Sequence, residues 1–212
     1  LRNSGVSKFP KTTLSKMLAG KMISMGPNIG STTHSISGNS TPKDLETALQ
    51  LMYLYVADPR FDAEEYETGI QQIKAVLPNL LNTPDFKFQK FVNDKLYAGN
   101  ERAVVIDEEV MSKASLETIE RVYRELYKNA AGATLTIVGN VDLETLKPMV
   151  EKYIGSIAKG KKPAQVNKDN LVQMAKGVSE NVLNVEMATP KKTVFQVWSG
   201  YMPVTTKDMV TL

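Results

Sequence analysis

The sequence of 212 residues contains no cysteine and a single histidine. Without cysteine the chain can form neither a disulfide nor a thiolate metal site, and it has no thiol nucleophile. The histidine, His34, lies among serines and threonines and has no acidic residue close to it in the sequence. Zinc sites draw several ligands from histidine, cysteine and acidic residues. We therefore interpret His34 as a strand histidine bonded to a hydroxyl or to water, rather than as a metal ligand or a general base.

Long apolar runs and a strong charge of one sign are also missing. No apolar run approaches the ~20 residues that a membrane-spanning helix needs, so we expect no membrane span. The net charge is +3, from 26 basic and 23 acidic residues. An excess this small gives no reason to expect nucleic acid or an anionic membrane as a partner. The absence of cysteine favours a periplasmic or exported protein, although cytosolic proteins can lack cysteine too, so the compartment stays open.

Common catalytic and phosphate-binding motifs are absent as well. No serine lies in a Gly-x-Ser-x-Gly pattern, which removes motif support for that class of hydrolase. Residues 26–31 are rich in glycine, but they lack both the Gly-Lys-Ser/Thr ending of a phosphate loop and the three-glycine dinucleotide pattern. Turn residues at Gly26, Pro27 and Asn28 favour a turn between two strands.

Two local patterns could suggest binding, and a structural interpretation is simpler for each. Four acidic residues gather within residues 62–67, in the expected first turn of a helix, where acids offset the helix dipole. Residues 86–91 interleave aromatic and basic side chains, as in some proteins that bind single-stranded nucleic acid. At helical spacing, however, Phe88, Phe91 and Val92 form one apolar stripe with lysines outside it.

Helices are expected to dominate the chain. Cap residues followed by apolar positions at helical spacing predict helix starts near Thr13, Thr41, Asp62 or Ala63, Thr83, Ser115 and Asp142. Pro78 is expected to break or kink the third of these helices.

Strands are expected at 22–25, 31–37, 133–138, 182–187 and 193–199, and residues 133–138 give the clearest strand pattern. Because helices outnumber strands and do not alternate regularly with them, the pattern predicts an α+β fold, with helices on one face of a mainly antiparallel or mixed sheet. A lysine-rich segment at 158–169, interrupted by glycine and proline, is the candidate linker. The chain opens without methionine and stops soon after a helix start at Thr205, so we interpret it as a fragment truncated at both ends.

Several stretches resemble the carboxy-terminal half of the long-chain pitrilysin/insulinase zinc metallopeptidases, especially the bacterial members. They occur in the family order and cover most of residues 10–160. These stretches are residues 14–21, 36–46, 49–55, 59–62, 136–142 and 153–157. No single stretch is diagnostic, and the ordered set carries the resemblance.

The resemblance implies four related α+β units, arranged as two halves that close around a peptide chamber. Residues 1–157 would be most of the third unit, without its first strands. Residues 158–174 would be the linker, and residues 175–212 would open the fourth unit. The family's zinc site lies in the first unit, on a His-x-x-Glu-His helix that this chain cannot contain because it has one histidine. The arginine and tyrosine that the second half contributes to catalysis would lie beyond Leu212. We therefore assign no catalytic residue, no metal ligand and no cofactor to this chain.

The function implied by the resemblance is that of a non-catalytic segment of a zinc-dependent metalloendopeptidase. Its partners would be the amino-terminal, zinc-bearing half of the same polypeptide and the peptide substrate. In the active unit, the stretch that matches residues 26–33 forms the edge strand that pairs with substrate backbone. The corresponding segment here, Asn28, Ile29, Gly30 and Ser31, is expected at most to line the chamber passively.

Two alternatives remain open at this point. The chain could belong to a catalytically inactive relative that acts as a structural or assembly subunit. It could also be a stand-alone protein-binding or nucleic-acid-binding module, although no motif favours that class. An upstream His-x-x-Glu-His motif would favour the peptidase over the inactive relative.

Overall fold

The computed structural model describes residues 4–30, 33–161 and 172–200, and these form two compact units. The first unit comprises Leu1–Leu77 and Ile106–Leu171, and the second comprises Pro78–Val105 and Val172–Leu212. The first unit contains α1 (Lys11–Met17), β1 (Ile23–Ile29), β2 (His34–Ser40), the 3₁₀ helix η1 (Pro42–Asp44), α2 (Leu45–Ala57), most of α3 (Ala63–Leu81), α5 (Glu108–Ser112), α6 (Leu116–Tyr127) and α7 (Leu143–Tyr153). The second unit contains the last residues of α3, α4 (Pro84–Leu96) and the 3₁₀ helix η2 (Glu101–Ala103).

The two strands β1 and β2 form an antiparallel hairpin in which Ile23 pairs with Ser40 and Ile29 pairs with His34. The Gly30 N–H donates to the Thr33 carbonyl at 2.8 Å, which makes this pair a hydrogen-bonded one. Bonded and non-bonded pairs alternate along an antiparallel ladder. Pro27 therefore falls at a non-bonded position, where its missing N–H removes no bond to β2. The turn predicted at residues 26–28 is wrong, because these residues lie inside β1.

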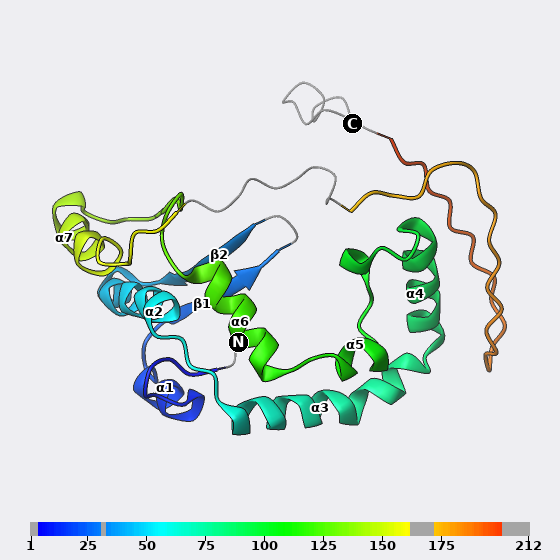
Figure 1. Cartoon of the computed structure of the whole chain (residues 1–212), viewed down its shortest axis with the longest axis horizontal. Helices are drawn as coiled ribbons and strands as arrows, with labels where there is room; N and C mark the ends of the chain where they lie inside the picture. The colour runs from blue at the N-terminus through cyan, green and yellow to red at the C-terminus, as the bar shows by residue number, and fades with distance from the viewer. Residues whose placement is uncertain (1–3, 31–32, 162–171, 201–212) are drawn as a thin grey trace. The chain divides into compact units, whose positions relative to one another are not determined.

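The main core of the first unit forms where α2 packs on the hairpin (Figure 1). Its buried members are Val6 from the amino-terminal segment and Leu51 and Tyr55 from α2. Partly buried apolar side chains surround these three, namely Leu14, Leu18, Ile23, Met25, Ile36 and Leu54. Burial of one apolar stripe of α2 against an antiparallel sheet confirms the predicted α+β class.

The polar contacts between α2 and α7 come from residues far apart in the sequence. The Tyr153 hydroxyl donates to the Glu46 carboxylate at 2.7 Å, and the Gln50 side-chain amide donates to the same hydroxyl at 2.9 Å. Lys152 lies 3.2 Å from Glu46 and completes the group. These bonds join the third quarter of the chain to the helix that covers the sheet.

Several predicted helix starts are confirmed by side-chain caps. Thr83, Ser115 and Asp142 each accept a hydrogen bond from a backbone N–H three residues later, at 3.2, 3.1 and 2.9 Å. Thr41 differs, because its hydroxyl donates to Asp44 and the chain first forms η1. Thr13 lies inside α1, which begins earlier than predicted.

The later predicted strands do not form a ladder. Residues 133–138, 182–187 and 193–199 carry no strand in the structure, where the described sheet consists of β1 and β2. Leu183, Val185 and Met187 are nevertheless half-buried, whereas the residues between them are exposed. The predicted alternation of buried and exposed side chains is therefore present at 183–187. A strand also requires a neighbouring strand to accept its backbone hydrogen bonds.

Helix α3 is longer than predicted. It continues past Pro78 to Leu81, so proline did not end it. A proline close to the end of a helix removes only one intrahelical bond, and few residues follow it. The helices at Glu108–Ser112 and Glu101–Ala103 were not predicted, because each is too short to show an apolar stripe.

We expect Leu51→Ala to lower the free energy of unfolding by about 2–5 kcal/mol, the usual result of truncating a buried leucine. Leu51 is only 5% exposed and belongs to the main core. Leu143→Ala is the matched control, since Leu143 is 72% exposed. Urea unfolding followed by circular dichroism measures both changes, and equal effects would contradict the assigned core.

Asp44 is expected to make the fold sensitive to acid. Its buried carboxylate accepts hydrogen bonds from the Met22 N–H at 3.2 Å and the Thr41 hydroxyl at 3.0 Å, and Lys21 lies 3.4 Å away. The Met22 bond is the largest of the causes that lower the pKa of Asp44. A lowered folded-state pKa gives stability that is complete above the unfolded pKa and is lost as pH falls through the folded pKa.

The Asp44→Asn variant should therefore unfold more easily than the wild type at neutral pH. The difference should shrink below about pH 4, the ordinary range of an aspartate. Glu151→Gln, which changes an exposed acid on α7, serves as the control. Urea midpoints measured across this range report the effect, and a difference that does not depend on pH would contradict the role of the carboxylate.

Candidate functional site

The segment predicted to line a peptide chamber lies at the free end of the β1–β2 hairpin. Asn28 and Ile29 end β1, and Gly30 follows them, whereas Ser31 lies outside the described residues. Asn28 and Gly30 are exposed, and the Ile29 side chain is 53% exposed. We call Ile29, Gly30, Thr33 and His34 the hairpin tip, and the pair of Asn28 and Ser35 lies directly behind it. The tip presents one large apolar side chain beside exposed backbone, which suits contact with an extended polypeptide.

Tyr127, the last residue of α6, holds the hairpin just behind its tip. Its hydroxyl lies 2.9 Å from the Asn28 carbonyl oxygen and 3.0 Å from that of Ser35. Asn28 and Ser35 are partners in the ladder, so a single phenol contacts both strands. No local pattern in the sequence reveals this role of Tyr127, because the contact joins positions that are 99 and 92 residues apart.

His34 contacts the ring of Tyr127 in an edge-to-face arrangement, with ring centroids 5.1 Å apart. The predicted position of His34 in a strand is confirmed, because His34 begins β2. Its hydrogen bond to a hydroxyl or to water stays a prediction. The described residues contain no group of three or more His, Asp or Glu side chains placed to hold a metal ion.

Tyr123 lies one helical turn before Tyr127 and is 1% exposed. Its hydroxyl donates to the Tyr55 carbonyl at 2.8 Å, near the end of α2 where carbonyl groups lack intrahelical partners. The two tyrosine rings are 4.5 Å apart, and Phe61 packs on Tyr123 edge-to-face at 5.6 Å. A tyrosine phenol is already protonated at neutral pH, so both hydroxyls are donors there, and burial raises the pKa of Tyr123 and of Tyr127 further.

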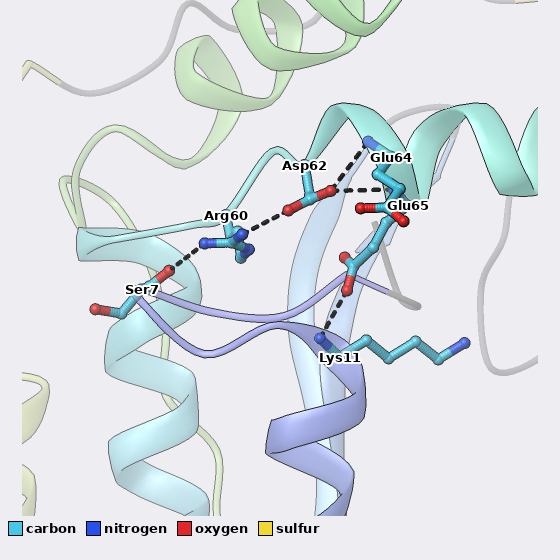
Figure 2. Close-up of polar contacts among 6 residues, drawn as sticks. All are labelled: Ser7, Lys11, Arg60, Asp62, Glu64 and Glu65. Carbon is cyan, nitrogen blue, oxygen red and sulfur yellow. Dashed lines mark hydrogen bonds and ion pairs between the residues drawn. The ribbon is translucent and has the colours of Figure 1, made fainter.

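The acidic cluster at residues 62–67 starts α3. One carboxylate oxygen of Asp62 accepts from the N–H groups of Glu64 and Glu65, each at 3.0 Å (Figure 2). The Glu65 bond is the largest of the causes that lower the pKa of Asp62, and Arg60 adds to it. The interpretation of this cluster as a helix start is therefore confirmed.

The same residues also fasten the amino-terminal segment. Arg60 pairs with Asp62 and reaches the Ser7 carbonyl at 3.5 Å, as Figure 2 shows. Glu65 accepts from the Lys11 N–H at 2.7 Å, at the first residue of α1. These bonds position backbone segments around the core that contains Val6, which is a structural role.

An apolar groove lies in the second unit, along α4. Phe88, Val92, Leu96, Tyr97 and Phe195 line it together with Gln89 and Asn93. Phe88 and Phe195 meet edge-to-face with centroids 6.3 Å apart. Phe88, Phe91 and Val92 are half-buried, as expected for the apolar stripe of this helix.

None of the helices in the described part of the chain is long and apolar enough to span a bilayer.

Part of the chain is similar to a known protein family. The model of the peptidase M16 inactive domain matches residues 113–210, which include α6 and α7. No curated protein matches the chain.

Solved protease structures share the fold. The periplasmic protease PqqL from Escherichia coli is 21% identical with a TM-score of 0.64, over 78% of this chain and 18% of that one. The ferredoxin protease FusC, solved as a point mutant in complex with Arabidopsis ferredoxin, is 16% identical with a TM-score of 0.63, over 82% of this chain and 19% of FusC. A peptidase M16 inactive domain from Pseudomonas fluorescens is 18% identical with a TM-score of 0.62, over 78% of this chain and 41% of that one.

This chain thus spans less than a fifth of PqqL and of FusC, which are 18% and 19% covered. M16 is the family of the pitrilysin and insulinase peptidases, which the sequence resembles. The chain is therefore similar to the inactive domain of M16 peptidases over residues 113–210, and it shares the fold of the protease structures named above.

Proposed function

We propose that this chain is a non-catalytic segment of a zinc-dependent metalloendopeptidase and that it forms part of the wall of the substrate chamber. The observation that carries the proposal is the match to the inactive domain in a chain that has a single histidine. Hydrolysis of a peptide by zinc needs several coordinating side chains and an activated water. The zinc site therefore belongs to another part of the polypeptide.

The partners that follow from this proposal are the amino-terminal, zinc-bearing half and a polypeptide substrate. FusC, which shares the fold, was solved with a ferredoxin, so a protein substrate is a reasonable class for this enzyme as well. The hairpin tip, together with Asn28 and Ser31, is the part of the wall that we assign to the substrate. The comparison with the periplasmic PqqL and the lack of cysteine support a periplasmic or exported enzyme.

A structural or assembly subunit of an inactive relative would have the same fold and the same single histidine. The two proposals differ in one feature, the presence of a His-x-x-Glu-His helix elsewhere in the polypeptide. Sequencing the gene upstream of Leu1 distinguishes them. A stand-alone nucleic-acid module would instead show oligonucleotide binding that weakens steeply with salt.

Zinc content provides the direct test of the proposal. We expect the isolated chain to bind far less than one equivalent of zinc after dialysis and to leave peptides uncut. We expect the polypeptide that also carries the zinc-bearing half to hold zinc and to cleave them. In that protein His34→Ala should leave the zinc content unchanged. Stoichiometric zinc and peptide cleavage by the isolated chain would refute the proposal.

Ile29→Ala tests the assignment of the tip to the chamber wall. In the complete peptidase it should raise KM about two- to fivefold and leave kcat unchanged, because it removes part of an apolar contact made equally in the ground state and the transition state. Ile106→Ala is the matched control, since Ile106 is 57% exposed and lies away from the hairpin in the sequence. Identical kinetics for both variants would remove the tip from the substrate site.

A further inference from the structure

We propose that Tyr127 is the positioning residue of the hairpin tip, because its hydroxyl fixes the last bonded pair of β1 and β2 before the tip. The consequence for peptide binding rests on the proposed chamber function, but the positioning itself does not. Three features of the structure support this role: the register of the hairpin, the geometry of the phenol and the anchoring of α6.

The register shows why the contact falls at a sensitive point. Gly30 and Thr33 form a bonded pair, so Asn28 and Ser35, two residues further from the turn, form the next one. Between them lies the non-bonded pair of Ile29 and His34. The tip therefore depends on very few ladder bonds, and a short two-stranded hairpin is only marginally stable by itself.

The phenol adds a bond that the ladder cannot supply. A carbonyl oxygen can accept two hydrogen bonds, so Asn28 and Ser35 can each keep a ladder bond and also accept from Tyr127. The single proton of the hydroxyl is shared between two acceptors at 2.9 and 3.0 Å. A shift of either strand by one residue would move one carbonyl away from the hydroxyl. The contact therefore opposes both opening of the tip and slippage of its register.

The anchor of the phenol is rigid. Tyr127 is 6% exposed, and its ring packs on the ring of Tyr123, a contact that a phenylalanine at position 123 would keep. The ring of His34 also contacts Tyr127 edge-to-face. Because α2 also packs on β1 and β2, the two tyrosines connect the tip to the same core that supports the rest of the hairpin. The tip is thus held from the helix side, while Ile29 remains exposed.

A simpler account is that Tyr127 satisfies its buried hydroxyl with the nearest carbonyl groups and has no effect on the tip. The chain contains a matched control for this alternative. Tyr123 and Tyr127 lie on the same helix, both are buried, and each hydroxyl donates to backbone carbonyl oxygen. The hydroxyl of Tyr123 differs in its acceptor, which is the carbonyl oxygen of Tyr55 on α2 and not a carbonyl oxygen of the hairpin.

The experiment compares amide hydrogen exchange in the wild-type chain, Tyr127→Phe and Tyr123→Phe. Both substitutions keep the ring and remove one hydroxyl. We expect Tyr127→Phe to speed exchange of the Gly30 and Ser35 amides about five- to tenfold, the factor for losing one hydrogen bond of ordinary net strength. Tyr123→Phe should change the exchange rates of these two amides no more than it changes the exchange rates of the amides in α7.

The positioning role is overturned if Tyr127→Phe leaves exchange at the tip unchanged, or if both variants accelerate it equally along with α7. In the second case the hydroxyl would stabilise the whole unit and not the tip. Urea unfolding of both variants separates this general effect from local opening.

The complete peptidase supplies the functional readout. Tyr127→Phe should raise KM for a peptide with kcat unchanged, and Tyr123→Phe should not. If Tyr127→Phe speeds amide exchange at the tip but leaves KM unchanged, the positioning role stands. The assignment of the tip to the chamber wall is then overturned. An unchanged tip with raised KM would overturn the positioning role alone.

Discussion

The stacked tyrosines of α6 connect the parts of the first unit that the sequence separates most widely. One hydroxyl is bonded to the end of α2 and the other to both strands of the hairpin. A two-stranded sheet cannot bury both of its faces and has little stability alone. The hairpin therefore depends on α2 for its apolar cover and on α6 for the polar contacts of its backbone. The exposed tip can be ordered because the residues immediately behind it are fixed.

The elements that could be predicted from the sequence are those determined by neighbours in the chain. Thr83, Ser115 and Asp142 were identified as caps because a cap and its N–H partner lie three residues apart. The apolar stripe of α2 was recognised for the same reason, and so was the helix start at Asp62. The α+β class and the family resemblance followed from these local features and from the ordered stretches, and the comparisons confirm both.

Features that depend on distant residues could not be predicted in the same way. The segments at 133–138 and 182–187 have the composition of strands, yet a ladder needs a second segment at the right distance. The contact of Tyr127 with Asn28 left no local pattern, since a tyrosine at a helix end reads as an ordinary apolar position. Pro27 looks like a turn residue in the sequence, because only the register of the hairpin shows that this position needs no backbone N–H.

The distribution of aromatic residues has a practical consequence for spectroscopy. The single tryptophan, Trp198, belongs to the second unit and is 84% exposed, whereas the buried tyrosines Tyr55, Tyr123 and Tyr127 belong to the first. Indole emission will therefore report mainly on the carboxy-terminal segment and will be red-shifted even in the native protein. Loss of the main core will be seen through phenol absorbance or near-ultraviolet dichroism. The two signals follow different units, so each can be monitored in the presence of the other.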